Sequence, residues 1–289
     1  MRKSVPPDRR SVRLAEALGC PDCRRPLPDS LRCPGCGVSG SRNGPQIAFA
    51  GFSDEELRQD PLNHLKESAK RRFGPLYPLA ISLLSPVYMS GSVRSFLRSF
   101  DLDRDLVADL GSGTQRYDPR VICVDGGSYA NVDLVADLSR LPLRDGVLSG
   151  VTSIAVLEHV PDPDAHIAEM WRVLAPGGRL FCYMPFIVPF HASPDDYQRY
   201  TKVGLETRFR NFEVLDVRVG GGPTSGLLWV LQEWLALALS FGSERLYRAL
   251  VPLMWVLSPL KILDAVMARH PAAPVIASGF VIEARKVGP

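Results

Sequence analysis

The chain has 289 residues, 46% hydrophobic and 22% charged, a balance typical of a globular protein with a buried core. Its 34 basic and 31 acidic residues leave a formal net charge of +3, which is too small to indicate a nucleic-acid-binding protein. Charged residues and prolines stand where a signal peptide would need an apolar stretch, so the sequence favours the cytoplasm. No uncharged apolar run reaches the roughly 18 to 20 residues of an ordinary membrane span.

The N-terminal part divides by composition into a basic tail and a cysteine-rich segment. Residues 1–15 are expected to form a flexible tail. Residues 16–50 contain two Cys-x-x-Cys pairs, which in a reducing compartment bind metal more often than they form disulfides, the alternative pairing. Four thiolates around one ion leave no open position, so we predict a structural zinc ribbon. Its ligands would be Cys20, Cys23, Cys33 and Cys36.

Residues 51–104 are predicted to be a helical lead-in, beginning with a capping box at Ser53 and Glu56. From residue 105 onward, apolar strands alternate with helical sequence, which predicts an α/β fold with a doubly wound parallel sheet over residues 105–289. A helix is expected over residues 164–174. The strands are expected at residues 106–110, 121–125, 132–137, 151–156, 179–184, 212–219 and 278–285.

The first of these strands ends in an Asp-x-Gly-x-Gly turn at residues 109–113. Two glycines let the backbone turn sharply and approach a ligand closely, at the strand end where open α/β sheets bind their ligands. Acids end the next two strands, at Asp125 and Asp137. Only residues 114–120 separate the turn from the second strand, whereas a crossover helix needs about a dozen residues, so the first helix must be truncated or absent.

This order of motifs, with residues 156–160 and the Arg-Val-Leu-Ala-Pro-Gly-Gly run at 172–178, resembles the class I S-adenosylmethionine-dependent methyltransferases, a Rossmann-like family. A nicotinamide dehydrogenase is the main alternative, but its fingerprint requires glycine where this chain has Arg116. The resemblance implies S-adenosylmethionine as cofactor, with contacts to its methionine end, ribose and adenine. In that order, the implied residues are Asp109, Gly111 and Gly113; then Asp125; then Asp137, Leu138, Ile154 and Ala155.

A dense polar and aromatic loop follows the fifth strand, at residues 185–201. His191 is a candidate general base there, while Tyr197 and Arg199 are candidates for positioning an anionic or sugar-like acceptor. His159 is a second candidate base. The structural alternative is that Asp195, Asp196 and Arg199 pair with one another and cap a helix starting near Thr201. The remaining histidines, His64, His166 and His270, are expected on the surface.

An apolar helical insertion occupies residues 220–274, before the last strand. Short apolar helices with tryptophan and flanking cations suit shallow insertion into a membrane interface. A homodimer surface through residues 226–262 and a lid over a hydrophobic substrate are the alternatives. A membrane contact would make a lipid-linked acceptor attractive.

The sequence thus predicts a methyltransferase that acts on an oxygen or nitrogen of a small-molecule acceptor, with saccharide or lipid-linked compounds as candidates. One alternative is an RNA methyltransferase whose ribbon grips RNA, although residues 20–36 contain no aromatic side chain for stacking on bases. The other is a non-catalytic adaptor that retains a cofactor-binding fold.

Overall fold

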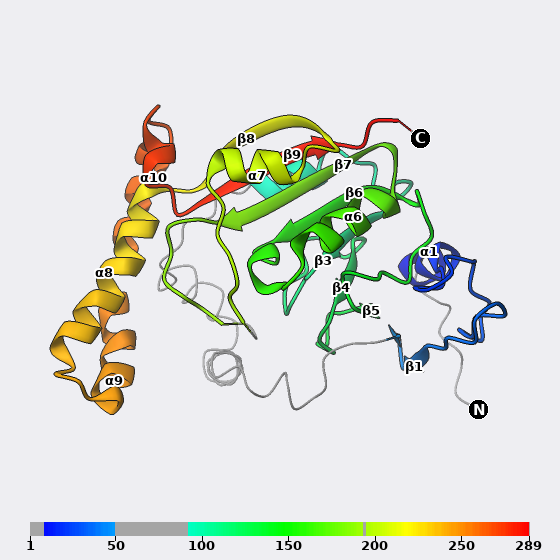
Figure 1. The fold of residues 1–289 in the computed structure, drawn as a ribbon, viewed down its shortest axis with the longest axis horizontal. Helices are drawn as coiled ribbons and strands as arrows, with labels where there is room; N and C mark the ends of the chain where they lie inside the picture. Colours follow the sequence, from blue (N-terminus) through cyan, green and yellow to red (C-terminus); the bar gives the residue numbers. More distant parts are fainter. Residues whose placement is uncertain (1–8, 50–91, 193–194, 289) are drawn as a thin grey trace.

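The computed structural model describes residues 9–49, 92–192 and 195–288 (Figure 1). The predicted helical lead-in at residues 51–104 lies outside the described residues as far as residue 91, including its capping box. Its described remainder contains α5 (Ser92–Leu97).

The described part of the chain forms one sheet with the strand order β1-β2-β5-β4-β3-β6-β7-β9-β8. Six consecutive strands in this order run parallel to one another: β2, β5, β4, β3, β6 and β7. Strand β1 pairs antiparallel with β2. The bounds are β1 (Ser41–Asn43), β2 (Gln46–Ala48), β3 (Val107–Leu110), β4 (Ile122–Asp125), β5 (Leu134–Val135), β6 (Leu148–Ile154), β7 (Leu174–Pro185), β8 (Glu213–Gly221) and β9 (Gly279–Arg285).

The prediction of an all-parallel sheet is wrong at one edge. Strand β9 is antiparallel to both of its neighbours, β7 and β8. The insertion between β8 and β9 leaves and rejoins the sheet at the same end, since Gly221 is paired with Gly279. The last strand must therefore run back along β8, and the sheet is mixed.

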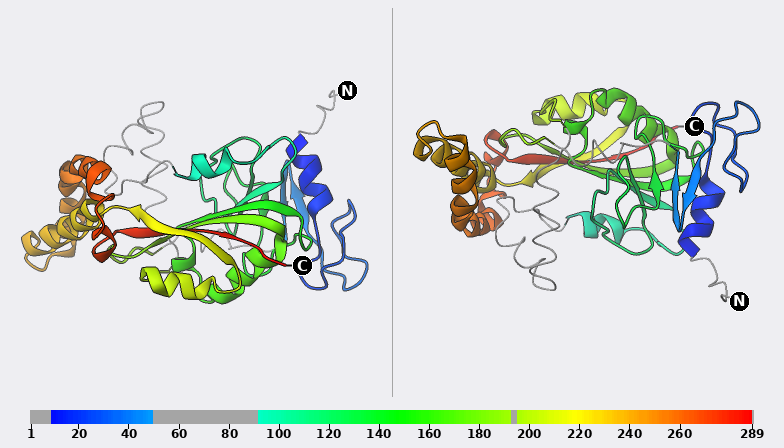
Figure 2. Two further views of the ribbon diagram at one scale, coloured as in Figure 1. Left: turned by 90° about the horizontal axis from the view of Figure 1, so that it is seen from above. Right: turned by 90° about the horizontal axis from the view of Figure 1, so that it is seen from below.

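Two apolar cores cover the two faces of the sheet (Figure 2). Helices α6 (Pro163–Val173) and α7 (Lys202–Arg208) lie on one face, and α5 lies on the other. Helix α6 begins after Asp162, whose side chain accepts a hydrogen bond from the Ala165 amide. No helix lies between β3 and β4, as the short spacing predicts, so the glycine turn opens directly into a loop.

The N-terminal segment is more ordered than the sequence predicts. Residues 9–15, expected in a flexible tail, belong to α1 (Arg9–Ala17), so that prediction is wrong for them. Leu14 and Ala17 on this helix are each 2% exposed because they pack into the main core. The three arginines among residues 9–15 made this segment look like a solvated tail, although Leu14 and Ala17 lie on one face of a helix.

The apolar insertion forms a helical arm at the end of the molecule opposite α1 (Figure 1). The Asp264 carboxylate accepts hydrogen bonds from the Thr224 and Ser225 amides and so caps the start of α8. The arm consists of α8 (Pro223–Leu239), α9 (Glu244–Met254), the 3-10 helix η3 (Trp255–Leu263), α10 (Asp264–Met267) and the 3-10 turn η4 (Ala273–Val275).

One helical run in the arm, Glu244–Met267, is long and apolar enough to cross a membrane by length and composition. The sequence analysis found no uncharged apolar run of that length, and the run contains Pro252 and Pro259. In the structure α9, η3 and α10 follow one another without a break, because both prolines are accommodated inside helical turns.

Candidate active site

The glycine turn after β3 has the conformation that its sequence predicts. Gly111 has a φ of 80°, and a Cβ atom there would lie 2.3 Å from Cγ2 of Val156, so no other residue fits. Gly113 has a φ of 51°, and no atom of the described residues lies within 4 Å of the position of its missing Cβ. The turn therefore leaves open space beside the backbone at the carboxyl end of the sheet.

Two carboxylates flank this turn. Asp125, at the end of β4, accepts hydrogen bonds from the amides of Gly113 (2.8 Å) and Gly127 (2.7 Å), which orient it. Asp109 in β3 is 2% exposed and accepts a hydrogen bond of 2.6 Å from the Thr152 hydroxyl. Burial raises the pKa of both carboxyl groups, that of Asp109 to about 7. Both predicted cofactor acids thus lie at the turn, in partly desolvated positions.

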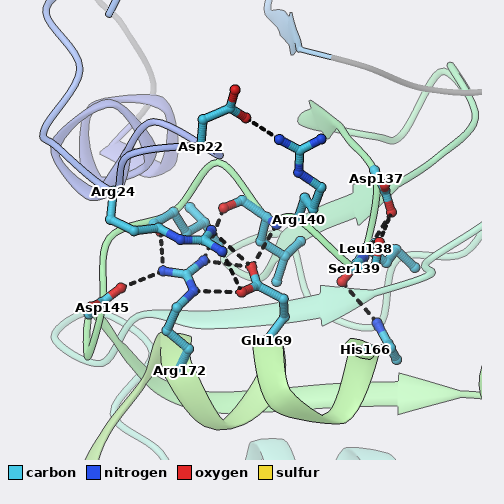
Figure 3. Close-up of polar contacts among 12 residues, drawn as sticks. Asp22, Arg24, Asp137, Leu138, Ser139, Arg140, Asp145, His166, Glu169 and Arg172 are labelled. Carbon is cyan, nitrogen blue, oxygen red and sulfur yellow. Dashed lines mark hydrogen bonds and ion pairs between the residues drawn. The ribbon is translucent and has the colours of Figure 1, made fainter. Parts of the chain in front are cut away.

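The predicted adenine-side residues lie in the loop after β5. The Asp137 carboxylate accepts hydrogen bonds from the amide and hydroxyl of Ser139, which hold the loop in a tight turn. Nδ1 of His166 lies 3.1 Å from the Leu138 carbonyl oxygen and links this loop to α6 (Figure 3). His166 was expected on the surface, which is wrong: it is fully buried, and burial lowers its pKa to about 4.

Ile154 and Ala155 lie at the carboxyl end of β6, the strand that follows β5 in the chain. Ala155 has a φ of 55°, which is uncommon for a residue other than glycine. Its amide nevertheless donates to the Tyr183 carbonyl oxygen at 3.0 Å. Such local strain is concentrated at functional sites, and the sequence carries no signal for it.

The candidate acceptor loop places His191 beside His159. Their ring centroids are 5.2 Å apart, and each ring lies near the carboxyl group of Glu158, which has no exposed surface. Burial raises the pKa of Glu158 to about 8 and lowers that of His191, so both groups favour their neutral forms. The structure thus brings the two predicted histidines together around a buried acid.

Arg199 and Tyr197 differ in their positions. Arg199 pairs with both carboxylate oxygens of Asp196, and its Nη2 lies 3.2 Å from Nδ1 of His191. Tyr197 is 52% exposed and donates to Asp195 at 3.0 Å, so its hydroxyl lies outside this cluster. The structural alternative is correct for the Asp196–Arg199 pair. The cap of α7, however, is Thr201, whose hydroxyl accepts from the Gly204 amide.

The arm contributes a residue that the sequence did not assign to the site. Trp229 of α8 has its ring centroid 5.2 Å from that of His191. The start of the arm therefore lies against His191 of the candidate acceptor loop. Nothing in the sequence pattern of α8 distinguishes Trp229 from Trp234, which is 60% exposed.

The four N-terminal cysteines form the predicted cluster. Their sulfur atoms all lie within 4.8 Å of one another, as four ligands of one ion require. Both pairs turn in the same way: the residue after the second cysteine of each pair has a positive φ, 64° at Arg24 and 80° at Gly37. The Gly35 amide also lies 3.4 Å from Sγ of Cys33. Cys20, Cys23, Cys33 and Cys36 are free thiols, not disulfides.

The cysteine-rich segment is joined to the sheet by a polar network (Figure 3). Arg24 pairs with Glu169 of α6 at 3.1 Å, and Arg140 pairs with Asp22. Arg172, from the glycine-terminated run of the sequence, also donates to Glu169 and to the Leu141 carbonyl oxygen. Arg172 therefore has a structural role here, and Arg24 is paired with Glu169 of the same protein.

Comparisons with known proteins identify the central segment. The family model described as methyltransferase domain matches residues 109–182, which contain the glycine turn, Asp125, Asp137 and η2 (Leu157–His159). Residues 109–182 are thus similar to a methyltransferase domain.

Two curated relatives that are named as methyltransferases are similar to part of this chain. A ubiquinone/menaquinone biosynthesis C-methyltransferase of Acidiphilium cryptum is 38% identical over 71 residues, 25% of this chain and 28% of that protein. A "probable S-adenosylmethionine-dependent methyltransferase" of Mycolicibacterium smegmatis is 31% identical over 94 residues, 32% of this chain and 37% of that protein. The aligned segments thus span well under half of either relative.

Among solved structures, the 1,6-didemethyltoxoflavin-N1-methyltransferase of Burkholderia thailandensis is similar to this chain with a TM-score of 0.43 and 14% identity. The similarity covers 87% of this chain and 95% of that one.

Proposed function

We propose that the whole chain is an S-adenosylmethionine-dependent methyltransferase acting on an oxygen or nitrogen of a small-molecule acceptor. The observation that carries this proposal is the open glycine turn between Asp109 and Asp125, inside the methyltransferase domain. The donor set fits the cofactor: Asp125 can accept ribose hydroxyls, and the turn lacks the Cβ that would fill the space beside it.

When bound, the cofactor supplies an electrophilic methyl group. The residues of this chain contribute mainly by positioning, since methyl transfer is an in-line displacement. Asp109 and Asp125 would hold the donor, while His191 and Arg199, from the loop after β7, would contact the acceptor. A neutral His191 can accept a proton from an acceptor hydroxyl or amine during transfer.

Cofactor binding tests this proposal by calorimetry with S-adenosylmethionine. Asp125→Asn should weaken binding by about tenfold or more, because it removes a charged acceptor of hydrogen bonds. Asp216→Asn is the matched control, since Asp216 lies on the far strand β8 with a 51% exposed side chain. Equal affinities in the two variants, or no binding by the native chain, would overturn the cofactor assignment.

The acceptor class is proposed from the chemistry of the loop. An arginine, two histidines and an exposed tyrosine suit hydroxyl-bearing or anionic compounds, so saccharide and lipid-linked saccharide acceptors are the first candidates. A screen with methyl-labelled cofactor tests this. Transfer to RNA in place of small molecules would favour the RNA alternative, and cofactor binding without any turnover would favour an adaptor.

We also propose that the four cysteines bind one structural zinc ion. The grouping of their four sulfur atoms within 4.8 Å of one another supports this, as does the small size of the segment, for which a metal would supply folding energy. Zinc content of the purified protein tests it: about one equivalent is expected at this cluster, and its absence from protein purified without chelator would contradict the assignment.

For the arm we propose a peripheral membrane contact. Its outer surface exposes large apolar side chains, with exposed arginines close to them at Arg245, Arg248 and Arg269. Such a surface would present a lipid-linked acceptor near Trp229. Cosedimentation with anionic vesicles tests this contact; a protein that stays in the supernatant as a homodimer would support the dimer alternative instead.

A further inference from the structure

A second group of potential metal ligands lies at the carboxyl end of β6, away from the cysteines. It consists of Glu158 and His159 in η2 and His191 in the loop after β7, and one ligand atom from each lies within 4.8 Å of the others. Among the described residues, only this group and the cysteine cluster meet that condition. The ligand types differ, with nitrogen and oxygen here and sulfur there.

Glu158 is the unusual member of the group. It has no exposed surface, and neither carboxyl oxygen has a hydrogen-bond partner among the described residues. Oε1 lies 3.7 Å from Nε2 of His159 and 3.9 Å from Nε2 of His191. A buried carboxyl group without hydrogen bonds is costly, and native structures compensate that cost with a cation or a proton.

The two imidazole rings are held so that the same nitrogen faces Glu158. Nδ1 of His159 lies 2.5 Å from the Asp195 carbonyl oxygen, and Nδ1 of His191 lies 3.1 Å from that of Pro189. A carbonyl oxygen only accepts, so we assign the proton of each neutral ring to Nδ1. The unprotonated Nε2 atoms then converge on the carboxyl group, the arrangement by which outer hydrogen bonds orient histidine ligands.

The proximity of Arg199 to His191 is compatible with a proton on Nδ1 of His191. Its Nη2 lies 3.2 Å from Nδ1, but the same guanidinium is engaged by both oxygens of Asp196. A carboxylate is the stronger acceptor, so Nδ1 remains free to donate to Pro189. Arg199 and Asp196 thus fix the edge of the ring that faces away from Glu158.

We propose that Glu158, His159 and His191 form a binding site for one divalent transition-metal ion. Ligands about 2.1 Å from a tetrahedral ion lie about 3.4 Å from one another, so the observed separations need to close by only a few tenths of an ångström. Three protein ligands leave at least one position open, as in catalytic metal sites. An acceptor hydroxyl bound there would lose its proton more readily, which prepares it to receive a methyl group. With the ion bound, His191 acts as a metal ligand in place of a general base, since its Nε2 is then occupied.

This site goes beyond the proposed methyl transfer, and its test does not depend on the cofactor. Cobalt(II) is added to protein whose cysteines have first been saturated with zinc, in the absence of S-adenosylmethionine. Visible absorption then reports cobalt held by nitrogen and oxygen, and a thiolate charge-transfer band would reveal cobalt in the cysteine cluster instead. We expect one further equivalent of cobalt, without the thiolate band.

Four variants locate the ion. Glu158→Gln and His191→Ala should each weaken cobalt binding by at least about tenfold, since each removes a direct ligand. Glu244→Gln and His270→Ala are the matched controls, with the same residue types in the arm, and should bind as the native chain does. Thermal unfolding of each variant verifies that it is folded.

The measurement on the native chain decides the question even if a variant fails to fold. Absence of a second equivalent of cobalt, or a thiolate band as the only signal, overturns the proposal. Equal affinity in a folded Glu158→Gln variant also overturns it. Because no methyl transfer is measured, a chain without methyltransferase activity can still confirm the metal site, and the reverse also holds.

Discussion

The cysteine-rich segment and the helical arm lie at opposite ends of one sheet and are attached to it in different ways (Figure 1). The cysteine-rich segment adds β2 to the sheet beside β5 and buries its apolar residues, with Leu31 and Ile47 each 2% exposed. The arm leaves the sheet and exposes its apolar residues, with Phe241 at 88% and Val256 at 74%.

The two ends thus differ in that one is built into the sheet and the other leaves an apolar surface exposed. The cysteine-rich segment has few apolar side chains and is attached through strand pairing with β5. The metal ion that we propose at its cysteines would add folding energy. Within the apolar arm, polar contacts join α8 to α10 at Asp264 and α8 to η3 between Gln232 and Ser258 (3.1 Å), while its outer side chains remain exposed. Exposed apolar patches of this kind mark protein or membrane contacts.

The largest expected effect is at the cysteine cluster. Cys33→Ala, or removal of the metal with a chelator, should unfold the segment and destabilise the sheet edge by several kcal/mol, roughly the scale of a structural zinc site. Thermal unfolding measures this, and Cys123→Ala serves as a buried cysteine control away from the cluster. If the chelator leaves the unfolding temperature unchanged, the segment does not depend on metal.

Acid should destabilise the domain through His166, beneath the loop that the cysteine-rich segment contacts. Burial lowers the pKa of His166 to about 4, so between its ordinary value of 6.5 and 4 the unfolded chain binds the extra proton and stability falls with falling pH. The loss is up to about 3 kcal/mol. His166→Gln should flatten this part of the profile relative to the native chain; parallel profiles in denaturant titrations would contradict the assignment.

Removing exposed apolar side chains from the arm should weaken its binding to vesicles without unfolding it. Replacing Trp234 and Leu237, 60% and 59% exposed, with serine should weaken vesicle binding by at least about tenfold, since each large apolar side chain contributes about 1.5–3 kcal/mol when fully buried. The unfolding temperature should change little. Arg285→Ser on β9 is an exposed control on the sheet. Unchanged vesicle binding in the arm variant would count against a membrane contact.

The smallest expected effects on stability come from removing one polar contact of the cysteine-rich segment and one within the arm. Arg24→Ala removes a partly exposed ion pair with Glu169 and should cost about 1 kcal/mol. Asp264→Ala removes the cap of α8 and should cost about 1–2 kcal/mol. Limited proteolysis should then cleave the cysteine-rich segment first in the former variant and the arm first in the latter. The opposite order would show that Arg24 does not attach the cysteine-rich segment and that Asp264 does not hold the arm together.

Local patterns in the sequence determined much of this protein. The apolar runs predicted the strands from β3 to β9, the short spacing predicted the missing helix after the glycine turn, and the Cys-x-x-Cys pairs predicted the sulfur cluster. These features depend on neighbouring residues, whose periodicity and turn chemistry act over a few positions. The position of Asp109 and Asp125 beside the glycine turn also followed from strand ends alone, because parallel strands place those ends at one edge.

Only the tertiary structure decided the rest. The direction of β9 depends on where the arm returns to the sheet, and the burial of His166 depends on how α6 packs. The convergence of His159 and His191 on Glu158 joins two strand ends whose order in the sheet no local pattern specifies. Burial then changed the chemistry of these groups, because the free energy of a charge is set by its surroundings in the folded protein, not by its neighbours in the sequence.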